Sequence, residues 1–153
     1  MNMAYSIWQL KLKKLQMKRI LLYLFITSLI TSCTSSLEYL QSGHYDAAIE
    51  KSRRKIIRKP KDKEILVLEE AYRRINNQDK ERIEFLKKEG HPGNWESIFD
   101  IYSGMSSRQE FIRPLLPLHI KSKNRDAVFE ILNYDNEIIN AKQKAAEYFY
   151  ARA

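Results

Sequence analysis

Apolar side chains recur every three or four positions along most of the chain, which is the spacing of one face of an α-helix. The pattern predicts a first short helix around residues 37–40. Ser42 and Gly43 end this helix, because glycine is favoured where a helix terminates in a left-handed turn. A second helix is predicted to begin at Tyr45 and to stop near Pro60, because the residue before a proline avoids helical angles.

Two more helical stretches are predicted before the clearest break in the chain. Apolar residues at helical spacing mark residues 65–72, and a charged stretch with interspersed apolar residues marks residues 79–89. The polar run 76–79 separates the two. Three helix breakers in the loop 90–94 then end this region, and Asn94 can cap the next helix by accepting a hydrogen bond from a free N–H.

A strongly amphipathic helix is predicted after the loop, with apolar residues at i, i+3, i+4, i+7 and i+10. These are Trp95, Ile98, Phe99, Tyr102 and Met105. The face could bind a partner helix, but core packing is favoured because large apolar side chains on one helix face are normally buried. The run 107–110 fits a capping box for a further helix, which Pro114 and Pro117 cut short.

The pattern changes after residue 118. Short apolar stretches with β-branched residues, separated by a polar run at 121–126, are compatible with a small β-hairpin within residues 118–132. Asp135 or Asn136 can cap a last helix at residues 137–151. The predicted fold is therefore mainly α, with one short hairpin.

The predicted helices of residues 37–72 resemble a tetratricopeptide repeat and the first helix of a second one. The matching positions are Gly43, Tyr45, Ala48, Ile49, Ile56 and Pro60, followed by Ile65, Leu68, Ala71 and Tyr72. Ser52 and Lys55 depart from the family, which has an aromatic and a small residue there. The resemblance implies tetratricopeptide-like helical hairpins over residues 33–89. Residues 90–153 are expected to form a helical segment with the β-hairpin and an open final helix.

An apolar run of a different kind lies near the start of the chain. Lys18 and Arg19 precede it, it extends over residues 20–30, and small polar residues lead from it to the single cysteine, Cys33. This is the layout of a secretory signal peptide. The run is shorter than the roughly 20 apolar residues that a membrane-spanning helix needs, and it lacks the polar stripe typical of a helix packed in a core.

The residues that end this segment are Ile30, Thr31, Ser32 and Cys33. They resemble the lipobox of bacterial lipoproteins, in which the signal peptide is cut before the cysteine, the thiol receives a diacylglyceryl group and the new amine is acylated. The resemblance implies that the segment up to residue 32 is removed as a signal peptide. Translation is expected to start at Met17, directly before the basic pair Lys18 and Arg19. The resemblance also implies that Cys33 anchors the protein in lipid rather than packing as a buried thiol. Thr34, in place of aspartate, favours the outer membrane over the inner.

Charge is informative only after that segment is set aside. The whole chain has 27 Lys and Arg residues against 19 Asp and Glu. Five of these cations and none of the acids lie in residues 1–32, so residues 33–153 keep 22 against 19, a net charge of +3. This near balance argues against nucleic acid as a partner. The remaining 121 residues suffice for one small domain, and a single cysteine committed to lipid leaves no disulfide.

Eight of the remaining cations are concentrated in residues 51–63, where Asp62 is the only acid. They are Lys51, Arg53, Arg54, Lys55, Arg58, Lys59, Lys61 and Lys63. A solvated helix face is the default interpretation, since exposed helix faces commonly carry lysine and arginine. Near a lipid anchor, the run could instead touch anionic headgroups.

No group of residues has the spacing of a catalytic or metal site. His44, His91 and His119 are far apart and lack the cysteine partners or the His-x-x-x-His spacing typical of zinc sites. The four glycines form no phosphate-binding loop. We therefore expect no catalysis, no metal, no cofactor and no identifiable small-molecule substrate.

The predicted function is that of a lipid-anchored helical-repeat adaptor of the bacterial envelope, which binds envelope proteins. The alternative is that the chain is the N-terminal fragment of a longer envelope binding lipoprotein or enzyme whose working domain follows. Residues 145–151 favour this alternative, because their alanine and aromatic side chains resemble the entry helix of another repeat.

Overall fold

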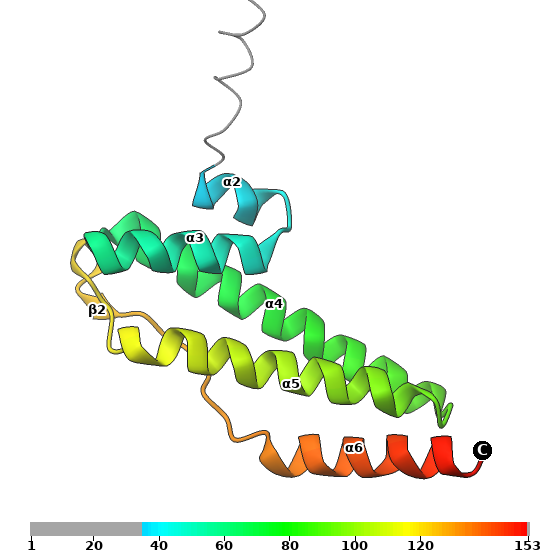
Figure 1. Cartoon of the computed structure of the whole chain (residues 1–153). Coiled ribbons are helices and arrows are strands. Elements are labelled where there is room, and N and C mark those ends of the chain that lie inside the picture. The colour runs from blue at the N-terminus through cyan, green and yellow to red at the C-terminus, as the bar shows by residue number, and fades with distance from the viewer. Residues whose placement is uncertain (1–34, 153) are drawn as a thin grey trace, which may run out of the picture. The chain divides into compact units, whose positions relative to one another are not determined.

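The computed structural model describes residues 35–152, and these form the fold shown in Figure 1. Its helices are α2 (Ser36–Gln41), α3 (Tyr45–Arg58), α4 (Asp62–Glu89), α5 (Asn94–Ile112) and α6 (Asp135–Tyr150). Two short strands, β1 (His119–Ile120) and β2 (Arg125–Asp126), pair antiparallel with His119 opposite Asp126. The predictions of a mainly α fold and of a short hairpin within residues 118–132 are confirmed.

Several helix ends follow the local signals in the sequence. α2 begins with a capping box, in which the Ser35 hydroxyl accepts from the Glu38 N–H at 3.1 Å and the Glu38 carboxylate accepts from the Ser35 N–H at 3.3 Å. Gly43 and Gly90 follow α2 and α4 with φ of +80° and +70°, a conformation that glycine adopts without steric penalty. α3 ends two residues before Pro60, as predicted.

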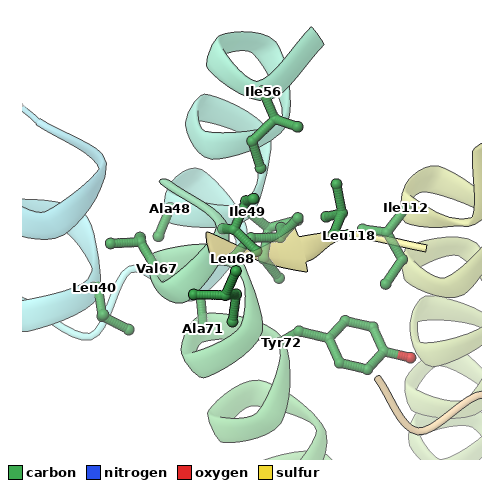
Figure 2. Close-up of a cluster of buried hydrophobic side chains, with 12 residues drawn as sticks. Leu40, Ala48, Ile49, Ile56, Val67, Leu68, Ala71, Tyr72, Ile112 and Leu118 are labelled. Atoms are coloured by element: carbon green, nitrogen blue, oxygen red, sulfur yellow. The ribbon is translucent and has the colours of Figure 1, made fainter. Parts of the chain in front are cut away.

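The first core cluster lies where α2, α3 and the N-terminal half of α4 meet the end of α5 and the hairpin (Figure 2). Its buried side chains are Leu40, Ala48, Ile49, Ile56, Ile65, Val67, Leu68, Ala71, Tyr72, Ile112, Leu118 and Ile120. Ala48 and Leu68 are both fully buried, at 0% exposure. Tyr72 points from α4 towards α5, and its hydroxyl donates a hydrogen bond to the Glu130 carbonyl at 2.9 Å.

The second core cluster lies between the C-terminal half of α4 and helices α5 and α6, which lie side by side (Figure 1). Its buried side chains are Ile83, Leu86, Ile98, Met105, Tyr134 and Ala141, with Trp95, Phe99, Ile101, Tyr102 and Ile138 packed against them. The apolar face predicted after the loop 90–94 is therefore packed in the core, which was the favoured interpretation.

The predicted separation of helices at residues 76–79 is wrong, because α4 is one helix of 28 residues. The range Asp62–Glu89 holds no glycine or proline, and asparagine costs only about 0.7 kcal/mol relative to alanine in a helix. Asn76 is buried at 3% exposure, and Ile83 and Leu86 beyond it belong to the second core cluster. Packing on α5 thus continues the helix through a locally unfavourable run.

The predicted capping box at residues 107–110 is also wrong, since α5 runs through it without a break. Arg108 instead pairs with Asp79 of α4. The side-chain oxygen of Gln109 accepts a hydrogen bond from the Leu132 N–H at 2.6 Å. These side chains serve contacts between elements, which no local pattern could indicate.

The predicted caps of α5 and α6 differ in the structure too. Asn94 is the first residue of α5, and its side-chain nitrogen donates to the Leu86 carbonyl at 3.1 Å, so it closes the end of α4 instead. Asp135 and Asn136 lie within the first turn of α6, whose N-cap residue Tyr134 makes no side-chain capping bond. Tyr134 is held there by its burial in the second core cluster.

Candidate functional site

The lipobox residues and Cys33 lie outside the described residues, so the site is built from the start of the described fold. Thr34 and Ser35 separate Cys33 from Ser36, the first residue of α2. Three residues span at most about 11 Å when fully extended. The covalent chain therefore allows at most about 11 Å between the Cα atoms of Cys33 and Ser36.

A buried network fixes the start of α2 to the turn between α3 and α4. The hydroxyl of Ser36, which is fully buried, donates to the carboxylate of Glu64. The ammonium of Lys55 donates to the same carboxylate at 2.9 Å and lies 3.1 Å from the Ser36 hydroxyl. Burial opposes ionisation of Glu64, but the hydrogen bonds from Ser36 and Lys55 outweigh it and hold its pKa below the ordinary value of 4.5.

The 3₁₀ turn Lys121–Lys123, which follows β1, packs on the start of α4. The backbone N–H groups of Lys121 and Ser122 donate to the Asp62 carboxylate at 3.3 and 2.6 Å. Hydrogen bonds from the side chain and the backbone of Ser122, aided by Lys121, hold the pKa of Asp62 below its ordinary value. The hairpin thereby places two further lysines beside the α3–α4 turn.

These contacts create a surface that we call the basic corner. It consists of Arg58, Lys59, Lys61, Lys63, Lys121 and Lys123, all of them exposed. Within residues 35–152 these six side chains form no salt bridge. The acids beside them, Asp62, Glu64 and Glu69, already accept hydrogen bonds from backbone N–H groups, from Lys55 and from Arg125. The corner therefore presents positive charge to its surroundings.

The other cations of the run 51–63 serve the fold itself. Lys51 lies 5.6 Å from the ring centre of Tyr39, and Arg53 lies 4.2 Å from the ring centre of Phe111. Arg54 pairs with a glutamate on its own helix, Glu50, at 3.4 Å. Lys55 completes the network with Glu64. The sequence groups eight cations together, whereas the structure divides them equally between internal contacts and the basic corner.

A cleft of about 320 Å³ lies between α4 and the chain that follows β2. Its lining includes Tyr72, Asn76, Arg125 and Glu130. Tyr134 and the ion pair of Arg108 with Asp79 lie outside this lining, but Tyr134 is close enough to Tyr72 and Glu130 of the cleft for both to affect its pKa. Among residues 35–152, no hydrogen-bond partner is found for Asn76 Oδ1, Arg108 Nε or the Tyr134 hydroxyl, although all three atoms are buried. Of these three residues, Asn76 lines the cleft, which therefore holds one buried acceptor atom without a partner among the described residues.

Two tyrosines, Tyr72 in the cleft and Tyr134 near it, are poorly suited to proton transfer near neutral pH. Burial raises the pKa of Tyr134 to about 12, so its hydroxyl stays protonated and can donate a hydrogen bond but cannot act as a base. Burial also raises the pKa of Tyr72 and, against the attraction of Arg108, that of Asp79. The arrangement favours a structural polar network.

The three histidines each have a local partner. His44 Nδ1 lies 2.9 Å from the Ser42 hydroxyl, and His91 Nδ1 accepts from the Gly93 N–H at 3.1 Å. His119 lies 2.9 Å from Asp126 across the hairpin. In the part of the chain that the structure describes, no group of three or more His, Cys, Asp or Glu residues is placed to hold a metal ion.

Comparisons with protein-family models, with curated proteins and with solved structures found no match to this chain. Among the described helices, none is both long enough and apolar enough to cross a membrane. The resemblances to lipoproteins and to tetratricopeptide repeats therefore stay predictions from the sequence.

Proposed function

We propose that this protein is a lipid-anchored protein of the bacterial envelope, whose helical domain binds partner proteins and performs no catalysis. The observation that carries the proposal is the run Ile30, Thr31, Ser32 and Cys33 at the end of a signal-peptide pattern. The structure supports it indirectly, because a capped helix begins three residues after Cys33. A lipid on Cys33 would hold this domain directly at the membrane surface.

Protein binding is supported by the outer surface of α6. Ile139, Phe149 and Tyr150 are 64%, 51% and 83% exposed, although the same helix buries Ala145 and also Ala141, which belongs to the second core cluster. Exposed apolar side chains on a helix are the anchors that helix-recognising partners use. The tetratricopeptide resemblance, with repeats that bind proteins through helix surfaces, agrees with this proposal.

The first experiment is an intact-mass measurement on the native protein extracted from membranes, with Cys33→Ala beside it. A species that begins at Cys33 and carries acyl chains supports the anchor, and its loss in the variant assigns the lipid to that residue. An unmodified 18.2 kDa chain in the soluble fraction contradicts it. A lipidated chain much longer than the 121 residues from Cys33 to Ala153 favours the alternative, a longer lipoprotein with a further working domain.

The second experiment tests the adaptor. A photo-crosslinking amino acid replaces Tyr150 in cells, and a matched variant carries it at Ser97, an exposed position on α5. Discrete crosslinked species that form from position 150 and not from position 97 support a specific partner on α6. Equal crosslinking from both positions indicates random collisions and contradicts this part of the proposal.

A further inference from the structure

We propose that the basic corner lies against the anionic phospholipid headgroups of the membrane that holds the lipid of Cys33, and that it sets the orientation of the domain on that membrane. This inference rests on the proposed function, because it assumes that Cys33 is lipidated. It adds a second contact between the protein and the membrane, formed by cationic side chains and anionic headgroups.

The α3–α4 turn, which carries most of the basic corner, lies close to the start of α2. Lys55 Nζ lies 3.1 Å from the Ser36 hydroxyl, so the α3–α4 turn is packed against the start of α2. Ser36 is in turn three residues from Cys33, a reach of at most about 11 Å. Screening in physiological salt acts over about 8 Å. The reach from Cys33 to α2 is thus comparable to the screening length, so a lipid on Cys33 would let the basic corner approach the membrane's surface charge.

The basic corner concentrates six exposed cations on one surface. The corner joins four cations of the α3–α4 turn to two from the turn Lys121–Lys123. The nearby carboxylates of Asp62 and Glu64 are already hydrogen-bonded within the fold. Each cation close to an anionic leaflet is attracted to it, and the contributions of a cluster add up.

The two ends of α4 are far apart, so residues near each end can be compared for their distance from the membrane. α4 starts at the basic corner and has 28 residues, which corresponds to about 42 Å of helix. Ser97 lies on α5 just after the loop that follows the far end of α4. If the basic corner faces the membrane, position 59 lies at the headgroups and position 97 lies away from them.

The experiment uses the purified, lipidated protein with a single introduced cysteine, Lys59→Cys or Ser97→Cys. Cys33 is the only natural cysteine, and its thiol is acylated in the lipidated protein, so an environment-sensitive dye labels the new position alone. The protein is incorporated into vesicles of phosphatidylcholine, with or without phosphatidylglycerol, that carry a nitroxide quencher on their headgroups. We expect several-fold stronger quenching at position 59 than at position 97 in anionic vesicles, and little difference in neutral vesicles or at high salt.

A charge variant tests which side chains are responsible. Arg58→Gln, Lys61→Gln and Lys63→Gln, combined in the Lys59→Cys protein, should remove most of the extra quenching. The matched control removes three exposed cations elsewhere, Lys87, Lys88 and Lys142, and should leave the quenching unchanged. Far-UV circular dichroism verifies that both variants keep their helices.

Three results would contradict either the anchor or the membrane-facing corner, and each is recognised by a different measurement. If Cys33 is not lipidated, the intact mass lacks acyl chains, which contradicts the proposed function itself. If the lipidated protein inserts but both positions are quenched equally, the anchor stands and the membrane-facing corner is overturned. Quenching at position 59 in vesicles, combined with protection of that position by a protein in native membranes, would assign the corner to an acidic protein partner and would also overturn the inference.

Discussion

At the scale of single residues, Glu64 joins three elements through one carboxylate. It belongs to α4, accepts from Ser36 of α2 and from Lys55 of α3, and is only 7% exposed. A buried carboxylate is stabilising only when its hydrogen-bonding capacity is met, because the charge otherwise bears the full cost of desolvation. Here three adjacent helices are fixed to one another at the start of the described fold.

Glu64→Gln should lower the free energy of unfolding by about 1–2 kcal/mol at neutral pH, since hydrogen bonds to charged groups contribute about 1.5–3 kcal/mol and Lys55 remains partly solvated. The folded pKa of Glu64 lies below 4.5, so its stabilising effect is present above that value and is lost as pH falls through the folded pKa. The difference between wild type and variant in urea unfolding should therefore narrow in acid. An equal difference at all pH values would contradict this account, and the exposed Glu84→Gln serves as control.

Arg108 of α5 and Asp79 of α4 form an ion pair between the two helices. Burial raises the pKa of Asp79 above 3.8 although Arg108 attracts its charge. Arg108→Met should destabilise the fold by about 3 kcal/mol at neutral pH, as expected when one partner of a buried pair is removed. Because the cost comes from ionised Asp79, stability of the variant should recover as pH falls and that carboxyl takes up a proton. The double variant with Asp79→Asn should be less destabilised and should lose this pH dependence in urea unfolding.

At the scale of elements, glycine has opposite roles in α4 and α5. Gly90 ends α4 with φ of +70°, whereas Gly104 lies inside α5. A Cβ at Gly90 would meet nothing within 4 Å, and one at Gly104 would meet Arg108 Nη1 at 3.7 Å, an ordinary contact. Backbone conformation, not space, therefore decides the effect of a substitution at either position.

Gly90→Ala should lower the free energy of unfolding by about 1 kcal/mol, because alanine disfavours the left-handed conformation. Gly104→Ala should raise it by about 0.5–1 kcal/mol, because alanine is the better residue in a helix interior. Thermal unfolding of the two variants beside the wild type measures both effects. Shifts of the same sign would show that the two glycines do not differ in the assumed way.

At the scale of the described domain, α4 contributes to both core clusters. Leu68 and Tyr72 of its N-terminal half lie in the first cluster, and Ile83 and Leu86 of its C-terminal half lie in the second. The polar contacts of Asn76 and Asp79 lie between the two halves. A helix shared in this way couples the two clusters, since neither can unfold completely without releasing part of α4.

Leu68→Ala in the first cluster and Ile98→Ala in the second should each cost about 3 kcal/mol, the usual range for truncation of a buried aliphatic side chain. Both should lower one common transition rather than split it. Trp95, the only tryptophan after residue 33, reports on the second cluster by fluorescence, while circular dichroism reports on all helices. Separate midpoints for the two signals in Leu68→Ala would contradict the coupling.

The helical class, the hairpin and those helix boundaries that local chemistry sets could all be predicted from the order of residues. Gly43, Pro60 and the loop 90–94 mark ends that any tertiary structure must respect, because backbone conformation is restricted there whatever the neighbours are. The apolar face from Trp95 to Met105 was likewise predictable, since helical periodicity is a property of the chain. The interpretation of Cys33 also belongs to the sequence and stays a prediction.

The partners of the polar side chains, in contrast, depend on how the folded elements pack together. The tertiary structure continued α4 through residues 76–79, turned the apparent capping box at 107–110 into contacts with distant segments, and moved Asn94 to the end of the preceding helix. It also divided the basic run and added Lys121 and Lys123 to the exposed half, across about 60 residues of chain. The physical reason is that a polar group takes the partner that folding brings within hydrogen-bond distance, and sequence spacing does not encode that distance.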